Sequence, residues 1–415
     1  MKPLGIYIHI PYCVRRCPYC GFYSNATGQS CLDITDYFDL LKQELTLRSD
    51  MTDAYYVDSI YFGGGTPSLA EPELIGGMID EIASVYDVTD DCEISMEANP
   101  GTLSGVSVKT QLAHVAAAGE CSGSGAEEAP YFTTADAVSR LKAYRAAGVN
   151  RLSLGVQSFD DSVLRTLGRI HSADDARRAY SDARKAGFDN VSMDLMFGVP
   201  GQNEEIWTST VEELASMLPE HVSFYSLQIE EGTKFYNDYK MGDMVPVSDE
   251  EDRRMYHSAI EILREHGYGQ YEISNAALPG KECRHNMKYW TFCDYLGIGA
   301  SASSFMDGVR RTNPGAGYQV FVRDGLPESG LPENHRNSDF DNAADYMITG
   351  LRLADGVDEE DFTSRFGKTV WEMYPDAKKE LREFFDDGRI VEEDGKLYIS
   401  EQGFDVSNKI MEVFV

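Results

Sequence analysis

Three cysteines near the amino terminus have the spacing of a shared metal site. Cys13, Cys17 and Cys20 follow one another at C-x3-C-x2-C spacing within one short loop. Thiolates placed this closely can face one metal centre, and soft sulfur ligands favour iron–sulfur clusters, zinc or copper(I). Three ligands are one short of a closed tetrahedral site. Either a remote fourth ligand completes the centre, or one metal position stays open for a small molecule.

Two simpler interpretations of these cysteines are a disulfide with a spare thiol and a structural zinc site. The other five cysteines are scattered along the chain, which suits a reducing cytoplasm better than a disulfide framework. A structural zinc site usually shows a second C-x2–4-C pair further along, and this sequence has none. With no signal peptide and no apolar run near the roughly 20 residues of a membrane span, we expect a cytoplasmic protein without an integral membrane segment.

The elements around the cysteines predict a parallel α/β architecture. The run Gly5 to Ile10 has the apolar, β-branched pattern of a strand, and Pro11 ends it just before the cysteine loop. Strand and helix patterns then alternate six times, which indicates parallel βα units in an open, partial TIM-like barrel. The further predicted strands cover 57–62, 93–99, 151–159, 191–198 and 221–229.

Several polar or glycine-rich segments follow these strands directly. Gly63 to Ser68 (GGGTPS) comes after the second strand, where backbone N–H groups can approach a ligand closely. Glu97 ends the third strand, and Asp194 is the lone charge in the apolar fifth strand, where a buried charge needs a partner or a function. Together with Gln157, these groups should share one face with the cysteine loop, as ligand-binding groups of barrel enzymes do.

The cysteine spacing, with Tyr19 before the last cysteine, resembles the signature of the radical S-adenosylmethionine (SAM) superfamily. The resemblance implies that Cys13, Cys17 and Cys20 hold a 4Fe-4S cluster whose fourth iron is chelated by SAM. It also implies a partial (βα)6 barrel. The SAM contacts that it implies are Tyr7, Tyr19, Gly64, Gly65, Thr66, Glu97, Gln157, Arg169 and Asp194.

Later motifs resemble a narrower group, the oxygen-independent coproporphyrinogen III oxidase-like proteins. GIYIHIPYC, GGGTPS, EANP, NRLSLGVQSF, LGRIH and DLMFGVPGQ occur in this order. The oxidases carry a fourth cysteine where this chain has Phe22, and a longer segment before the first strand. Both departures resemble the haem chaperones of the HemW type, which implies haem binding and transfer to an acceptor, such as a respiratory membrane protein. The alternative is a coproporphyrinogen oxidase or another radical SAM enzyme that modifies porphyrins.

A second signature, HNxxYW at 285–290, is characteristic of that chaperone group and is linked there to haem binding. His285 can supply an axial imidazole, and Tyr289 or Trp290 can cover a porphyrin face. Cys283 is a further candidate haem ligand. The simpler interpretation is that His285 is a polar residue satisfied within the fold and that Trp290 belongs to the core.

The chain divides into three predicted parts. Residues 1–235 form the barrel, with a small-residue insertion at about 101–131 that includes Cys121; residues 236–338 carry HNxxYW and associate with the barrel. Residues 339–415 should form a small winged-helix-like α+β domain. Its predicted helices are 343–353, 358–366 and 370–386, followed by a hairpin that turns at Asp394-Gly395.

Composition excludes one class of partner. The net charge is −32, from 69 acidic and 37 basic residues, which argues against a general nucleic-acid or anionic-membrane surface. The C-terminal part is itself strongly acidic, so we expect a structural or substrate-covering domain there rather than a DNA-binding one. A well-solvated acidic surface is the simplest interpretation, and a docking face for a partner is the alternative.

Overall fold

The computed structural model describes residues 1–26, 32–103 and 136–415. The predicted insertion at about 101–131 begins within a short 3-10 helix, Pro100–Thr102, and its residues from 104 on, with Cys121, lie outside the described residues. None of the helices in the described ranges is long and apolar enough to cross a bilayer.

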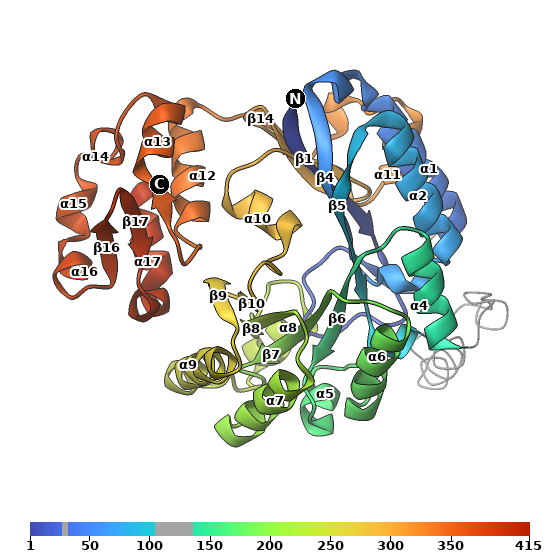
Figure 1. The fold of residues 1–415 in the computed structure, drawn as a ribbon, viewed down its shortest axis with the longest axis horizontal. Coiled ribbons are helices and arrows are strands. Elements are labelled where there is room, and N and C mark those ends of the chain that lie inside the picture. The colour runs from blue at the N-terminus through green and yellow to red at the C-terminus, as the bar shows by residue number, and fades with distance from the viewer. Residues whose placement is uncertain (27–31, 104–135) are drawn as a thin grey trace.

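Six parallel strands form the centre of the fold, as predicted. They pair in the order in which they occur along the chain, with helices on the outer side of the curved sheet (Figure 1). The strands are β1 (Lys2–Ile10), β4 (Tyr55–Gly64), β5 (Asp87–Ala98), β6 (Arg151–Gln157), β7 (Val191–Phe197) and β8 (His221–Ser226). The helices between them are α1 (Ile34–Leu47), α2 (Pro72–Val85), α4 (Ala137–Ala146), α5 (Asp161–Thr166), α6 (Ala173–Lys185) and α7 (Glu204–Met217).

The residue pattern of β1 shows why this sheet is buried on one face and functional on the other. Leu4, Ile6 and Ile8 are fully buried and alternate with Gly5, Tyr7 and His9. Side chains two residues apart share a face, so β1 turns its aliphatic side chains to one side and its polar ring side chains to the other. The second face is the one that carries the site described below.

The sheet continues past both edges of this parallel core. β11 (Tyr295–Ile298) pairs parallel with β1 and is followed by antiparallel β12 (Ser303–Met306), β13 (Val309–Thr312) and β14 (Glu333–Arg336). At the other edge, β10 (Asn275–Ala277) and β9 (Gly269–Glu272) lie antiparallel to β8 and to each other. Among the described strands, β14 and β9 are the two ends, so the barrel stays open.

Four helices and a short strand pair complete the first 338 residues. α8 (Lys234–Met241) and α9 (Asp249–Glu265) follow β8, while α10 (Arg284–Trp290) lies between the barrel and the C-terminal helices (Figure 1). The short strands β2 (Tyr12–Cys13) and β3 (Asn25–Ala26) pair within the cysteine loop, and α11 (Tyr318–Arg323) contacts α1.

The C-terminal part combines helices with a three-stranded sheet. α12 (Asp339–Gly350) and α13 (Glu359–Phe366) flank β15 (Val357–Asp358), which pairs with the hairpin β16 (Ile390–Glu393) and β17 (Lys396–Ile399). The predicted turn is confirmed, since Asp394 and Gly395 both have positive φ. The single helix predicted at 370–386 is wrong. The segment forms three short helices, α14 (Val370–Met373), α15 (Ala377–Glu380) and α16 (Arg382–Asp386), and Pro375 separates the first two.

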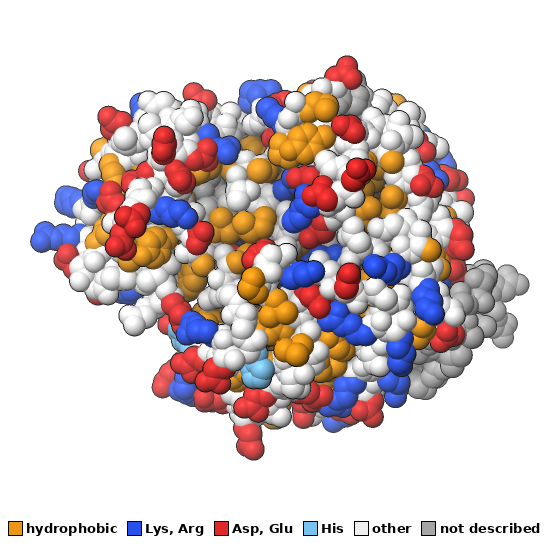
Figure 2. Space-filling view, in the orientation of Figure 1, with side chains coloured by type: hydrophobic (Ala, Val, Ile, Leu, Met, Phe, Trp, Pro, Cys, Tyr) orange, Lys and Arg blue, Asp and Glu red, His pale blue; other side chains and the backbone are white. Residues whose placement is uncertain are grey.

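The chain ends with α17 (Ser407–Met411), flanked by 3-10 turns at Glu401–Val406 and Glu412–Phe414. Acidic and basic side chains intermingle over the face drawn in Figure 2, with apolar side chains between them. The cysteines of the described residues, Cys13, Cys17, Cys20, Cys92, Cys283 and Cys293, are all free thiols.

Candidate functional site

A cavity of about 610 Å³ lies at the carboxyl ends of the parallel strands and extends into the barrel. It brings the three cysteines together with every residue predicted to contact SAM except Tyr7. The residues gathered are Cys13, Cys17, Cys20, Tyr19, Gly64, Gly65, Thr66, Glu97, Gln157, Arg169 and Asp194. Segments from five different βα units therefore meet in one place.

Polar groups are directed at the sulfurs of the cysteine loop. The loop turns tightly, because the Cys20 N–H donates to the Cys17 carbonyl at 3.1 Å. The Thr66 hydroxyl donates to the Cys13 sulfur at 3.6 Å, and the Arg169 guanidinium donates to the Cys17 sulfur at 3.8 Å. Burial raises the pKa of Cys13 to about 11, so the free thiol keeps its proton and metal binding must release it.

The donor set fits a cluster better than a single ion. In the described ranges, no three His, Cys, Asp or Glu side chains converge closely enough to hold one metal ion. A cubane cluster does not require such convergence, because each thiolate binds a different iron. The three thiols line one cavity, and two of them, Cys13 and Cys17, accept hydrogen bonds from Thr66 and Arg169, which stabilise thiolate charge.

Glu97 links the third parallel strand to the glycine-rich turn. Its carboxylate accepts from the Gly64 N–H at 3.2 Å and from the Tyr61 hydroxyl at 3.1 Å. Burial, with the nearby charge of Asp194, raises the pKa of Glu97 to about 7. Burial also raises the pKa of Asp194, whose oxygens accept from the Ser153 hydroxyl at 3.1 Å. Two buried carboxylates at one wall are suited to a cationic group of a ligand.

Gln157 and Arg169 form the wall beside the cysteines. Gln157 has a left-handed backbone, with φ of 68°, at a bulge that ends β6, and its side-chain oxygen accepts from the Tyr225 hydroxyl at 3.0 Å. Such backbone strain persists where the surroundings impose it, often at functional sites. Arg169 also donates to the Gly155 carbonyl at 2.7 Å, so its position is fixed by β6.

Tyr7 is the one predicted SAM residue that does not line the cavity. Its hydroxyl lies 3.1 Å from the Nδ1 atom of His9, and the Nε2 atom of His9 lies 2.9 Å from the Tyr23 carbonyl oxygen. Tyr7 and His9 thus tie the first strand to the cysteine loop. The structure adds Tyr61, Arg151 and Tyr225 to the cavity, which the sequence prediction missed. Tyr61 could have been found, because it lies two residues before Gly63 in a period-2 strand.

The residues of the predicted haem motif lie behind the cavity wall. His285 is buried, with its Nδ1 atom 3.0 Å from the Ser59 hydroxyl and its Nε2 atom 2.9 Å from the Tyr289 hydroxyl. Its ring stacks on Tyr61 at 5.2 Å between centroids. Burial, with the charges of Lys288 and Arg151, lowers the pKa of His285 to about 3, so the imidazole is neutral.

In this conformation both ring nitrogens of His285 have partners, as the simpler interpretation expected. Trp290 is half-buried, with the Arg352 guanidinium 4.3 Å above its ring, and Cys283 is a buried thiol 3.5 Å from a Glu93 oxygen. Only Asn286 of the motif lines the cavity. Ligation of haem by His285 would need the ring to leave Ser59 and Tyr289.

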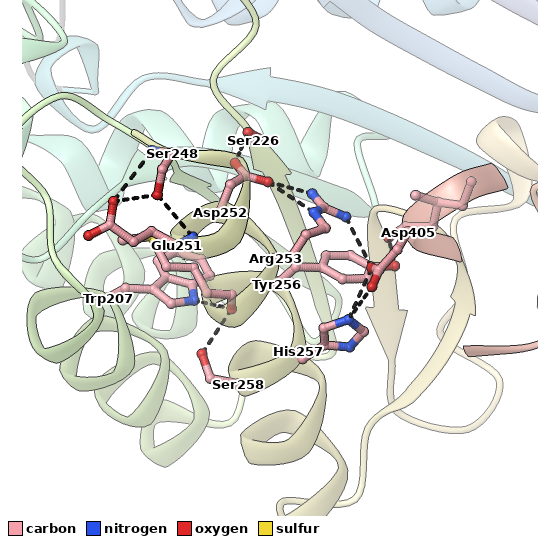
Figure 3. Close-up of polar contacts among 12 residues, drawn as sticks. Trp207, Ser226, Ser248, Glu251, Asp252, Arg253, Tyr256, His257, Ser258 and Asp405 are labelled. Atoms are coloured by element: carbon pink, nitrogen blue, oxygen red, sulfur yellow. Dashed lines mark hydrogen bonds and ion pairs between the residues drawn. The ribbon is translucent and has the colours of Figure 1, made fainter. Parts of the chain in front are cut away.

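A polar network connects the cavity mouth to the C-terminal part (Figure 3). Ser226, which lines the cavity, donates to Asp252 at the start of α9, and Arg253 pairs with Asp252 at 2.5 Å. Arg253 also lies 3.6 Å from Asp405, which accepts from the His257 ring at 3.0 Å. Charged groups therefore link the end of β8, through α9, to the 3-10 turn that follows β17.

Full-length relatives give the family of the chain. It is 32% identical to the heme chaperone HemW of Bacillus subtilis (strain 168) over 99% of this chain and 98% of that protein. It is 31% identical to the heme chaperone HemW of Escherichia coli (strain K12), over 100% of this chain and 99% of that protein. The chain belongs to the HemW family. A mitochondrial relative, radical S-adenosyl methionine domain-containing protein 1 of Bos taurus, is 30% identical over 98% of this chain and 86% of that protein.

Domain and structural comparisons agree with membership of the HemW family. Residues 127–214 match the radical SAM superfamily, and residues 341–406 match the HemN C-terminal domain. The fold resembles that of coproporphyrinogen III oxidase (HemN) from Escherichia coli, with a TM-score of 0.78 at 22% identity, over 100% of this chain and 90% of that one. The predicted radical SAM fold is thus confirmed, with HemW proteins as relatives over the full chain.

Proposed function

We propose that this protein binds a 4Fe-4S cluster and SAM, and carries haem that it passes to an acceptor protein. The observation that carries the proposal is the single cavity shared by the three cysteines, the glycine-rich turn and Glu97, in a chain of the HemW family. Those relatives are heme chaperones, which indicates haem as the cargo. Free cysteines agree with cytoplasmic haem loading, and the acceptor would be a haemoprotein, such as a respiratory membrane protein.

Specific side chains and the glycine-rich turn would hold the cluster and SAM. Cys13, Cys17 and Cys20 would bind the cluster, which in radical SAM proteins supplies an electron to SAM. Glu97 and Asp194 would hold the positive amino group or ribose hydroxyls of SAM, while the glycine-rich turn at Gly64 and Gly65, which carries no side chains, would let SAM approach the backbone closely. Tyr19, Thr66, Gln157 and Arg169 would close the remaining walls.

We propose that haem binds at the motif that contains His285, Tyr289 and Trp290. The neutral imidazole of His285 keeps a lone pair for iron, and opening of its contacts to Ser59 and Tyr289 would make one nitrogen available. Haem binding would then be coupled to movement of α10. A coproporphyrinogen oxidase is the alternative, and Phe22, which is 70% exposed at the cavity, occupies the position of its fourth cysteine.

Anaerobic reconstitution with iron and sulfide tests the proposal. We expect Cys17→Ala to lose the cluster, measured as iron and sulfide per chain, and wild type to bind haem with a defined absorbance change. Cys293→Ala is the matched control, because this thiol lies outside the cavity. Full iron content in Cys17→Ala contradicts the cluster assignment. Turnover of coproporphyrinogen without haem binding favours the oxidase.

A further inference from the structure

The cavity is lined by more residues than those assigned to the cluster and to SAM. Along β6 it touches both Gln157, beside the cysteines, and Arg151, at the first residue of the strand. These two positions are six residues apart along the strand, so their Cα atoms are roughly 20 Å apart at about 3.3 Å per residue. The charged Arg151 side chain acts on the pKa values of Glu97 and Asp194, further along the cavity. The same cavity is also lined by Ser274 and Asn275, at the start of β10, and by Asn286 of α10. None of these residues belongs to the predicted cluster or SAM set.

Arg151 is a buried cation whose hydrogen bonds are incomplete. It is 2% exposed, and within the described ranges its one hydrogen bond to a side chain is a long one of 3.5 Å to the Ser95 hydroxyl. Its Nε atom is buried and has no hydrogen-bond partner among the described residues. Arginine stays charged in proteins, and a buried charge with unmet donors is costly. An anion entering the cavity would satisfy those donors.

The acidic groups around Arg151 have other partners. Glu93 accepts from the backbone N–H groups of Arg284 and His285 at 3.1 and 3.2 Å, so its carboxylate caps α10. Glu97 accepts from Tyr61 and Gly64, and Asp194 accepts from Ser153. Nearby carboxylates therefore balance the positive charge of Arg151, but they accept hydrogen bonds from other groups and leave its Nε donor without a partner within the residues that the structure describes.

Asn275 provides a second unmet polar group among the residues that line this cavity. It is 7% exposed, its amide nitrogen donates to Glu272, and its Oδ1 atom is buried without a partner in the described part of the chain. Asn286 adds a side-chain amide to the lining. Arg151 and Asn286 offer N–H donors to a carboxylate, and Asn275 offers an acceptor to a water that hydrates it.

We propose that Arg151, Asn275 and Asn286 form a subsite for a carboxylate side chain of the cargo, a propionate of the bound tetrapyrrole. This inference rests on the proposed function, in which haem is the cargo. Asn286 follows His285 directly, so one short helix carries both the proposed iron ligand and a propionate contact. The planar fork of a guanidinium binds both oxygens of a carboxylate, which orients the ligand as well as holding it.

Haem and haem dimethyl ester, titrated in the same detergent buffer, test the subsite. Wild type should bind haem at least tenfold more tightly than the ester, because the ester has no carboxylate for Arg151. In Arg151→Met and in Asn286→Asp this difference in affinity should disappear. The first variant removes the guanidinium donors, and the second replaces the amide by a carboxylate of similar size whose negative charge repels the ligand. Iron content of the reconstituted variants shows that they are folded.

Gln228→Glu is the matched control, because it adds the same charge at an exposed position of the same cavity. It should keep the preference of wild type for haem over the ester. Equal affinity of wild type for haem and ester overturns the subsite while leaving the proposed function intact. Lower SAM affinity in Asn286→Asp with unchanged haem affinity also overturns it, because Asn286 would then belong to the SAM site. Absence of haem binding in wild type overturns the proposed function together with the subsite.

Discussion

The Glu97 carboxylate and the Gly64 backbone N–H are 3.2 Å apart, and this hydrogen bond joins the end of one parallel strand to the turn after its neighbour. The same carboxylate accepts from Tyr61, yet its pKa is raised because it is buried beside Asp194. The fold thus keeps Glu97 at a position where loss of its proton lowers the free energy of unfolding. Such a group is expected where binding, rather than folding, needs the charge.

Glu97→Gln should therefore raise the free energy of unfolding of the cluster-free protein at high pH. The carboxyl of wild type keeps its proton up to about pH 7 when folded but loses it near pH 4.5 when unfolded. Wild-type stability thus falls as pH rises between these values, by up to about 3 kcal/mol at about 1.4 kcal/mol per pH unit. Since the amide loses one accepted hydrogen bond, worth about 1 kcal/mol, we expect a net gain of about 1–2 kcal/mol at pH 8.

Urea unfolding at pH 5 and pH 8 measures this difference. The gain should shrink toward zero or reverse at pH 5, and SAM binding should weaken in the variant. The exposed Glu205→Gln serves as the control, with no pH-dependent difference expected. A variant less stable than wild type at pH 8 would show that the charged form of Glu97 is favoured by the folded state.

Gly64→Ala should destabilise the turn that carries the site. Gly64 has φ of 113°, and an added Cβ would lie 2.5 Å from the ring of His9, which holds Tyr7 and the cysteine loop. We expect a loss of about 2–4 kcal/mol in the free energy of unfolding, together with loss of SAM binding. Gly77→Ala in α2 is the matched control, because its Cβ would meet only the flexible end of Lys42. Unfolding in urea and SAM titration compare the two, and equal stability would refute the strain argument.

His285→Ala should lower haem affinity and also cost stability. It leaves the Ser59 and Tyr289 hydroxyls without their shared ring, and each buried unmet group costs about 1–3 kcal/mol. Ser59→Ala separates the two roles, because it removes one hydrogen bond but keeps the imidazole. If His285 binds iron, the absorbance spectrum of bound haem changes in His285→Ala and stays as in wild type in Ser59→Ala. Identical spectra in both variants would make His285 a structural residue.

Asp405→Asn should loosen the C-terminal part from α9. Asp405 accepts from His257 at 3.0 Å and lies 3.6 Å from Arg253, and these partly exposed pairs are worth about 1 kcal/mol or less. Amide hydrogen exchange over 401–414 should become faster at low salt, with a smaller effect at 1 M salt because screening already weakens the pairs in wild type. Asp376→Asn, at an exposed position of the same part, should change nothing. Unchanged exchange in Asp405→Asn would show that the interface is held by its other contacts, the Arg264–Glu401 ion pair and apolar packing.

The sequence alone determined the architecture and much of the site. Period-2 strands alternating with helices predicted six parallel units, because the spacing of apolar residues within each short segment indicates a strand or a helix. Cys13, Cys17 and Cys20 are close in sequence, so their shared loop needed no tertiary information. Glu97 and Gln157 were predicted at one face, since the carboxyl ends of parallel strands must meet at one edge.

Tertiary structure decided which side chains point where and what they contact. Tyr7 turned out to hold His9 instead of lining the cavity, and His285 has both ring nitrogens bonded to residues far from it in sequence or on its own helix. Arg151 reads in the sequence as the first residue of a strand, yet packing buries it with a donor unmet. Long-range pairing between β6, β10 and α10 creates that environment, and no local pattern in the chain encodes it.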